Sequence, residues 1–336
     1  MHDTTPPSTT EDDLTFSAAP RESRLAALAR DYGMHAALVV LILIFAWISP
    51  DFRTATNLIN ILNQVAVVGI VAVGMTFVIL TAGIDLSVGS LLALTSIASG
   101  LFAARTEATA GNIVLAILAP VALGLLAGLF NGAIVASNLV TPLIVTLGTL
   151  TAFRGIAVQW HVDPIYGLQD WYRDIGTARW LNIPVAVIIF AVIVGIASLV
   201  LNRTRFGREV YAVGGNEAAS LAAGIRVHRV KLMVYAISGV CVAVASIIQT
   251  SRVGAAQAIA GAGLELQAVA AVVIGGASLF GGRGKVSQTV IGTLVLGVLF
   301  NGLVLLNISS PIQNVIIGFI IIGAVALDGI LRRKSG

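Results

Sequence analysis

The side chains best suited to proton transfer lie outside the middle of the long apolar runs. The chain holds 16 Asp and Glu residues, four His and one Cys. Asp85, Glu265 and Asp328 are the carboxylates nearest to an apolar run, and each stands at an edge of its run. A proton-coupled carrier or an intramembrane hydrolase normally needs a titratable group at membrane depth. The absence of such a group from the middle of every run argues against both functions.

Neither a metal site nor a nucleotide site is predicted. The histidines and Cys241 are far apart in the sequence and show no metal-ligand spacing. The glycine-rich stretch around Lys285 lacks two required positions of a phosphate-binding loop, because Leu279 stands in place of its first glycine and Val286 in place of its Ser or Thr. We expect no cofactor, no metal and no catalytic residue.

The composition is that of a membrane protein. Of 336 residues, 57% are apolar and 11% charged, whereas soluble domains carry about 25% charged residues. The net charge of +4 comes from sparse basic residues between apolar runs, an arrangement that favours orientation in a bilayer over a nucleic-acid partner.

The apolar runs predict an all-α, polytopic transmembrane bundle. A helix that crosses the hydrocarbon core needs about 20 mostly apolar residues, and about ten runs qualify. They cover 34–49, 59–81, 86–104, 113–136, 142–160, 181–201, 230–251, 264–280, 286–307 and 310–331. The runs within 57–104 and 254–285 have uncertain edges and could contain broken helices.

The distribution of charge predicts that both termini are cytoplasmic. With the N-terminus inside, fourteen Lys and Arg residues fall on inner segments and five on outer ones, which follows the positive-inside rule. We therefore expect a disordered cytoplasmic tail at 1–33, a transmembrane domain at 34–331 with a large inner loop at 202–229, and a cytoplasmic tail at 332–336.

Two short patterns concern the packing of the bundle. Phe130-Asn131-Gly132 is echoed by Phe300-Asn301-Gly302, five runs later, which favours a 5+5 inverted repeat; a chance match in an apolar sequence is the alternative. The glycines at 124, 128 and 132 share one helical face, and close helix packing is a better explanation than a substrate groove.

The inner loop contains a predicted short helix. Asn216 can cap a helix over residues 217–223, and Gly224 can end it. A rigid helix on the cytoplasmic surface suits docking into a partner protein, and an ordinary connecting helix is the alternative.

Three blocks closely resemble the ribose-type sugar permease family of ABC importers. They are Gly74–Leu91 (GMTFVILTAGIDLSVGSL), Tyr211–Ala219 (YAVGGNEAA) and Ala270–Gly284 (AAVVIGGASLFGGRG), and the similarity extends over about residues 35–330. The resemblance implies a permease subunit of the cytoplasmic (inner) membrane that performs no bond chemistry itself. Its implied partners are ATP-hydrolysing subunits, a periplasmic or extracellular sugar-binding protein and a second permease subunit, most simply in a homodimer.

The resemblance also implies functional residues. The ATPase-coupling residues would be Gly214, Gly215, Asn216, Glu217, Ala218, Ala219, Gly224 and Ile225. A neutral sugar needs amide and hydroxyl partners, so candidates for its path are Asn63, Gln64, Thr81, Asn131, Gln267 and Asn301; each could instead bridge helices. We expect Asp85 to cap the helix start at Ser87–Val88, and Arg154 to meet carbonyl groups or to snorkel outward.

The leading substrate is ribose, with other pentoses, hexoses, polyols and autoinducer-2 as competitors. The alternative function is a stand-alone sodium-coupled or facilitative sugar transporter. A membrane enzyme has no catalytic constellation in this sequence.

Overall fold

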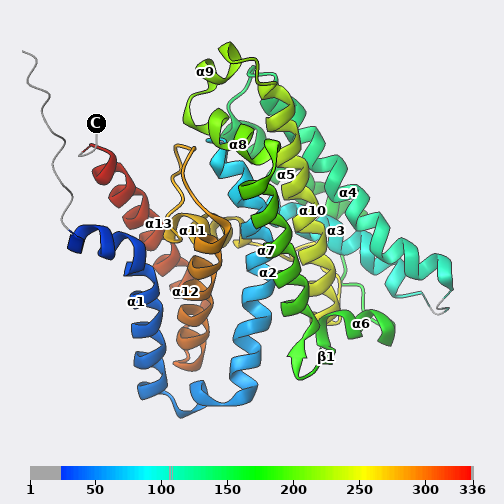
Figure 1. The fold of residues 1–336 in the computed structure, drawn as a ribbon. Helices are drawn as coiled ribbons and strands as arrows, with labels where there is room; N and C mark the ends of the chain where they lie inside the picture. The colour runs from blue at the N-terminus through cyan, green and yellow to red at the C-terminus, as the bar shows by residue number, and fades with distance from the viewer. Residues whose placement is uncertain (1–23, 106, 108, 334–336) are drawn as a thin grey trace, which may run out of the picture. The chain divides into compact units, whose positions relative to one another are not determined.

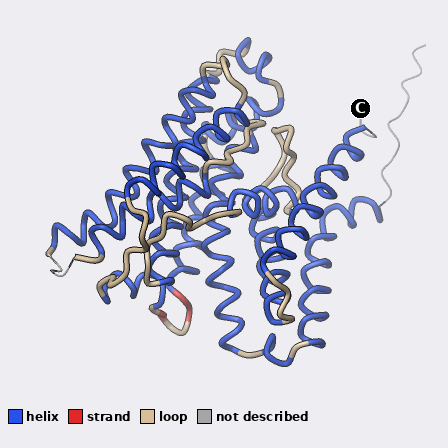
Figure 2. Tube along the Cα trace, turned by 180° about the vertical axis from the view of Figure 1, so that it is seen from behind, coloured by secondary structure: helices blue, strands red, loops and turns tan. Residues whose placement is uncertain are grey.

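The computed structural model describes residues 24–105, 107 and 109–333, and they are mostly helical (Figures 1 and 2). The contacts divide the chain after Gly33, and the larger unit begins at Met34. The elements are α1 (Arg24–Ile48), η1 (Pro50–Arg53), α2 (Ala55–Leu80), α3 (Val88–Ala103), α4 (Ala110–Ala136), α5 (Pro142–Trp160), α6 (Asp170–Thr177), β1 (Arg179–Trp180), β2 (Ile183–Pro184), α7 (Val185–Arg203), α8 (Arg205–Gly215), α9 (Glu217–Ala222), α10 (Val227–Val253), α11 (Leu264–Ile274), α12 (Val286–Leu305) and α13 (Ser310–Arg333).

Each predicted apolar run contains one helix of the structure. Within the described residues, six helices are long and apolar enough to cross a membrane, and they are α2, α4, α5, α7, α10 and α12. Shorter apolar helices occupy 33–48, 88–103, 264–274 and 310–323. The predicted N-terminal tail (1–33) and C-terminal tail (332–336) lie largely outside the described residues, although α1 begins at Arg24 and α13 continues to Arg333.

The helix predicted at 264–280 is shorter than expected. Its 11 residues span about 16 Å, well under the roughly 30 Å of a hydrocarbon core. Gly276 adopts a φ of +100°, its amide donates to the Val273 carbonyl, and the Ala277 amide donates to the Val272 carbonyl. The sequence did not predict this glycine-dependent helix end, because Gly276 lies within an apolar run.

The run predicted at 181–201 starts later because a small hairpin precedes it. Strands β1 and β2 pair antiparallel, and the turn residues Leu181 and Asn182 have φ values of +51° and +63°. Such left-handed pairs close two-residue hairpins. This hairpin is the one sheet in the part of the chain that the structure describes, so the fold is helical with a minor β element.

Helices α2, α3 and α10 form the centre of the bundle. In the most apolar window of each helix, 83% of α2 and 67% of α10 is buried, but only 22% of α7. Helix α4 packs along α10, and α12 along α2. The more exposed helices leave apolar side chains on the outside, as expected for a protein whose solvent is lipid.

Glycines allow α4 and α10 to touch through their backbones. A Cβ atom on Gly124 would collide with the carbonyl oxygen of Gly239 and lie 2.8 Å from the Cβ of Ala243. A Cβ on Gly132 would lie 2.9 Å from the Cα of Leu232. The glycines of this face are therefore packing residues, as predicted, and they line no described cavity.

Replacement of Gly124 by Ala is expected to destabilise the protein by about 1–3 kcal/mol, since α4 and α10 must move apart. Gly148→Ala on α5 is the matched control, because a Cβ atom there meets nothing within 4 Å. The measurement is the melting temperature of each purified variant in one detergent. Equal melting temperatures for the two variants would contradict this account of the α4–α10 contact.

Candidate functional site

The inner loop folds into two short capped helices at one end of the bundle. The Asn216 side chain accepts the Ala219 amide at 2.9 Å, and Gly224 has a φ of +80°, so the predicted capped helix is present as α9. Helix α8 was not predicted, because its glycines obscure it. The available signal was Thr204, whose hydroxyl accepts the Gly207 amide at 3.1 Å.

Helix α9 is fastened to two other parts of the chain by one ionic cluster. The Lys231 ammonium donates to the Glu217 carboxylate at 2.8 Å and to the Asn138 side-chain oxygen at 2.7 Å. The Asn138 amide also donates to Glu217, at 3.1 Å. Lys231 belongs to α10, and Asn138 follows the end of α4, so three separate segments are held together.

The cluster sets the ionisation of Glu217. Partial burial alone would raise the pKa of this carboxyl group, but the hydrogen bonds from Lys231 and Asn138 and the charge of Lys231 outweigh burial and hold the pKa below its ordinary value of 4.5. Glu217 therefore remains charged at neutral pH. Its carboxylate binds Lys231 and Asn138 of its own chain, so it anchors the helix.

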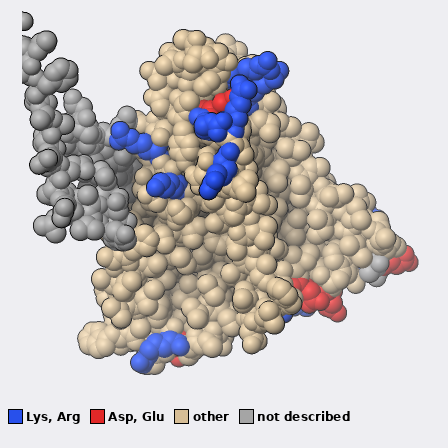
Figure 3. All heavy atoms as spheres, in the orientation of Figure 1, with Lys and Arg blue, Asp and Glu red and all other residues tan. Residues whose placement is uncertain are grey.

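The predicted coupling residues divide into an outer and an inner set. Gly215, Asn216, Ala218, Ala219 and Gly224 are exposed, and Leu221 beside them is 56% exposed. Gly214, Glu217 and Ile225 are partly buried and face the bundle. Figure 3 shows Lys and Arg side chains gathered at the end of this unit that carries α8 and α9. The outer set forms a small, nearly neutral knob beside basic surroundings.

A cavity of about 230 Å³ lies among α2, α3, α10, α11 and the loop that precedes α11. Its polar side chains are Gln64, Gln249, Arg252 and Gln267. The remaining lining residues are Val67, Val68, Leu92, Gly261, Ala262 and Leu264. None of these lining residues is a carboxylate. Three amides and a guanidinium over apolar walls suit a small neutral molecule with several hydroxyl groups.

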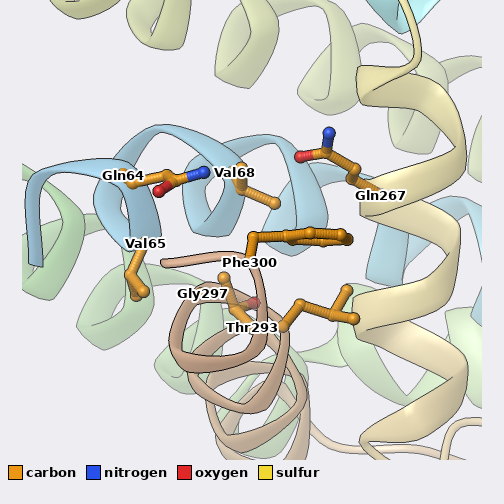
Figure 4. Close-up of a pocket in the computed structure, with 8 residues that line it drawn as sticks. Gln64, Val65, Val68, Gln267, Thr293, Gly297 and Phe300 are labelled. Atoms are coloured by element: carbon orange, nitrogen blue, oxygen red, sulfur yellow. The ribbon is translucent and has the colours of Figure 1, made fainter. Parts of the chain in front are cut away.

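Figure 4 shows the adjoining part of this region. Gln64 extends from α2 and Gln267 from α11, with Val68 between them and the ring of Phe300 on α12 below them in this view. Thr293 and Gly297 of α12 line the same narrow recess. The two glutamines are thus brought together from positions about 200 residues apart in the sequence, as a shared path would require.

The other predicted path residues lie elsewhere. Asn301 exchanges hydrogen bonds with Asn57, at 2.7 and 2.9 Å, and so joins α12 to α2. The Asn131 amide donates to the Ser87 hydroxyl at 2.9 Å. Thr81 bonds the carbonyl group of Val78. The structure gives these three residues bridging or local bonds, and only Gln64 and Gln267 of the six predicted residues line the cavity.

The sixth candidate, Asn63, lies next to Gln64 but does not line the cavity. Its side-chain oxygen is buried and has no hydrogen-bond partner among the described residues. Sequence reasoning missed Gln249 and Arg252, which it placed at or beyond the end of an apolar run. The available signal was the polar group Gln249-Thr-Ser-Arg252 within the last turns of α10.

Asp85 is less peripheral than its position at the edge of a run suggested. It is 1% exposed and lies inside the bundle, in the irregular stretch between α2 and α3. As predicted, it accepts the Ser87 amide at the start of α3, at 3.1 Å. It also accepts the hydroxyl groups of Ser87, at 2.6 Å, and of Ser238 on α10, at 3.2 Å. Asp85 is therefore a carboxylate inside the bundle, contrary to the expectation that it stands at the edge of its run.

Arg154 supports the loop that forms one wall of the cavity. Its guanidinium donates to the carbonyl oxygens of Ala258 at 2.6 Å and Ala260 at 2.9 Å. The prediction that it meets carbonyl groups is confirmed. Because the Ala258 and Ala260 carbonyl groups lie outside any helix or strand, the guanidinium on α5 supplies them with hydrogen-bond donors inside the bundle.

Replacement of Glu217 by Lys should loosen α9, because two cations would then face each other. The anchoring is worth about 0.2–1 kcal/mol for a partly exposed pair, so hydrogen exchange of the α9 amides should accelerate. The double exchange Glu217→Lys with Lys231→Glu should slow it again, and failure of that rescue would contradict the ionic role.

The same cluster gives α9 a defined pH dependence. A carboxyl group whose pKa is lowered on folding stabilises the fold above its ordinary pKa of 4.5, and this contribution disappears as the pH falls through the lowered value. The difference in α9 exchange between wild type and Glu217→Gln should therefore be full at neutral pH and should shrink below 4.5. An unchanged difference at acid pH would show that Glu217 acts without its charge.

Comparison with known proteins shows the family. The model of the family described as "Branched-chain amino acid transport system / permease component" matches residues 57–325. The ribose import permease protein RbsC of Haemophilus influenzae is 45% identical over 304 residues, which is 89% of this chain and 93% of that protein. Its namesake in Bacillus subtilis is 44% identical over 89% of this chain and 91% of that protein.

More distant relatives carry other sugar names. The D-allose transport system permease protein AlsC of Escherichia coli is 38% identical over 90% of this chain and 92% of that protein. No solved structure matches significantly. These relatives confirm the resemblance to ribose-type permeases that the three sequence blocks carried. The chain belongs to the family of branched-chain amino acid transport system permease components, and is the non-catalytic, multi-pass membrane subunit of a transport system.

Proposed function

We propose that this chain is the transmembrane permease subunit of an ATP-driven importer that moves a monosaccharide, with ribose as the leading substrate. The observation that carries the proposal is 45% identity to a ribose import permease over 89% of this chain. The chemistry of the cavity agrees with it, because amide groups and one guanidinium can replace the water that hydrates sugar hydroxyl groups. Allose, xylose and arabinose follow as candidates from the names of more distant relatives.

In the proposed assembly, the knob and the cavity serve different partner proteins. ATPase subunits would dock on the exposed face of α8 and α9, and a sugar-binding protein would deliver the sugar from the other side. A second permease subunit, most simply a second copy of this chain, would complete the pathway. The permease then drives no bond chemistry, but binds sugar differently in its outward-facing and inward-facing states.

We further propose ten membrane-crossing segments in two inverted halves of five, in the cytoplasmic membrane with both termini inside; the short α11 would cross together with its flanking loops. Helix α4 of the first half packs on α10 of the second, and α12 of the second half packs on α2 of the first. Likewise α3 packs on α5, and α11 on α13. In Figure 1, α2 and α10 run in opposite directions. This exchange of equivalent partners is what an inverted repeat produces.

The proposed orientation rests on charge. The end that carries α8 and α9 also carries the basic side chains of Figure 3, and cytoplasmic loops are the basic ones. The α9 end would therefore face the cytoplasm, and the end of α10 at Arg252 would lie toward the outside. The cavity would then open toward the side from which sugar arrives.

Uptake by this chain should depend on an ATPase supplied in trans. Liposomes that contain the chain alone should show no concentrative uptake of ribose, with or without a sodium gradient. Liposomes that also contain the cognate ATPase, ATP and the sugar-binding protein should accumulate it. Concentrative uptake by the chain alone would instead support the stand-alone sodium-coupled transporter, and equilibration alone would support a facilitative one.

Replacement of Gln64 or Gln267 by Ala should weaken sugar transport specifically. Each change removes one hydrogen-bonding group from the cavity at about 1 kcal/mol, or roughly a fivefold rise in the KM for uptake. Gln159→Ala is the matched control, because this glutamine is exposed at the end of α5 and lines no described cavity. The measurement is the uptake rate as a function of external sugar concentration at equal membrane abundance. Equal KM values for all three variants would contradict the proposal that sugar binds in this cavity.

A further inference from the structure

Three backbones meet without an intervening side chain where α8 joins the bundle. A Cβ atom on Gly214 would collide with the carbonyl oxygen of Leu80 and lie 2.6 Å from the nitrogen of Gly282. The Gly282 amide itself donates to that Leu80 oxygen at 2.9 Å. We call the contact of Leu80, Gly214 and Gly282 the inner junction.

Neighbouring contacts hold the inner junction closed. A Cβ atom on Gly281 would lie 2.8 Å from the Gly214 oxygen, and Gly281 and Gly282 have φ values of +84° and +72°, which other residues rarely adopt. The Tyr211 hydroxyl of α8 donates to the Gly284 carbonyl at 2.8 Å. Partial burial raises the pKa of the Tyr211 phenol, so that group keeps its proton and can remain the donor.

The inner junction is the common end of the two elements that carry the cavity glutamines. Leu80 is the last residue of α2, and Gln64 lies 16 residues before it, about 24 Å along the helix. Gly282 lies in the segment that joins α11, which carries Gln267, to α12. A displacement at Gly214 therefore acts on both elements at once.

A third connection leads to α10. Directly after Leu80, the irregular stretch between α2 and α3 contains Asp85, whose carboxylate accepts the Ser238 hydroxyl of α10 at 3.2 Å. Helix α10 carries the other two polar cavity residues, Gln249 and Arg252. All four polar groups of the cavity thus stand on elements connected to the inner junction.

We propose that Gly214 is a positioning residue. It transmits a displacement of the α8–α9 segment to α2 and to the segment that joins α11 and α12, and so changes the positions of the side chains that line the sugar cavity. The inference rests on the proposed function, since it needs an ATPase on α9. Its physical basis is that backbone in direct contact has no rotatable side chain to absorb a movement, and close-packed interiors transmit strain. Gly214 and Gly215 were both expected among the ATPase-coupling residues, but Gly214 is partly buried against the bundle and Gly215 is exposed.

The test compares the same added methyl group at two adjacent positions. Gly214→Ala places it inside the inner junction, whereas Gly215→Ala places it on the exposed face, where nothing lies within 4 Å. Gly195→Ala on α7, also free of contacts, is the control outside both surfaces. Each variant is reconstituted with the ATPase and the sugar-binding protein. Binding of the ATPase, and hydrolysis with and without sugar-loaded binding protein, are then measured.

Gly214→Ala is expected to bind the ATPase but to lose stimulation by the loaded binding protein on the order of tenfold, within the range of ordinary coupling between sites. Gly215→Ala should keep its stimulation by the loaded binding protein, and Gly195→Ala should match wild type. Stimulation of Gly214→Ala equal to that of Gly195→Ala would overturn the inference and leave the proposed function intact. Absence of stimulation in the wild type would overturn the proposed function, and this inference with it.

A second variant covers the case in which Gly214→Ala does not fold. Tyr211→Phe removes the hydrogen bond to Gly284 without adding an atom, and it should lower stimulation in the same direction by roughly twofold to threefold. Hydrogen exchange in the same sample should accelerate at Gly282, whose amide is held by Leu80. Unchanged exchange at Gly282 together with unchanged stimulation would overturn the inference.

Discussion

A helix that is interrupted inside a membrane leaves backbone N–H and C=O groups that hydrocarbon cannot satisfy, and this constraint shapes the functional parts of the chain. In the stretch after α2, the Asp85 carboxylate accepts a hydrogen bond from the Ser87 amide, and the Leu80 carbonyl accepts one from the Gly282 amide. In the loop before α11, Arg154 donates hydrogen bonds to two carbonyl oxygens. The Asp85–Ser87 bond is local, but the bonds made by Gly282 and Arg154 come from distant segments, so these irregular stretches also bind the bundle together. The cavity and the inner junction are both built from such stretches.

Glycine serves two different purposes in this arrangement. Along α4 and α10 it removes side chains so that two regular helices can touch, and the result is a fixed contact in the core. At 276–284 it also supplies left-handed backbone conformations, and the result is a turn that reaches the end of α2. A single count of glycines in the sequence cannot separate these uses. The close approach of Gly214 to the Leu80 carbonyl shows which glycines join the knob to the bundle.

The regular part of the fold could be predicted from the sequence because a bilayer imposes one simple pattern on each span. Helix positions and the Asn216 cap followed from local residue types, and a contact with carbonyl groups was one of the two outcomes expected for Arg154. The irregular part could not be predicted, because it depends on contacts between distant segments. The early end of α11 at Gly276, the burial of Asp85 and the placement of Arg252 in the cavity are examples. Polar residues in spans were the hardest to interpret: Asn301 faces Asn57 and Gln267 faces a cavity, although the sequence surroundings of the two are alike.

The anchoring of α9 has a consequence for how this protein can diverge. Its inner face is fixed by Glu217, Lys231 and Asn138, which belong to three segments, whereas Leu221 on its outer face touches little of its own chain. Substitutions on the outer face therefore leave the helix in its place. The inner three positions can change only in concert. A chimera that moves residues 216–224 from one permease to another must carry positions 138 and 231 with them. Otherwise the transplanted helix loses the side chains that hold it in place.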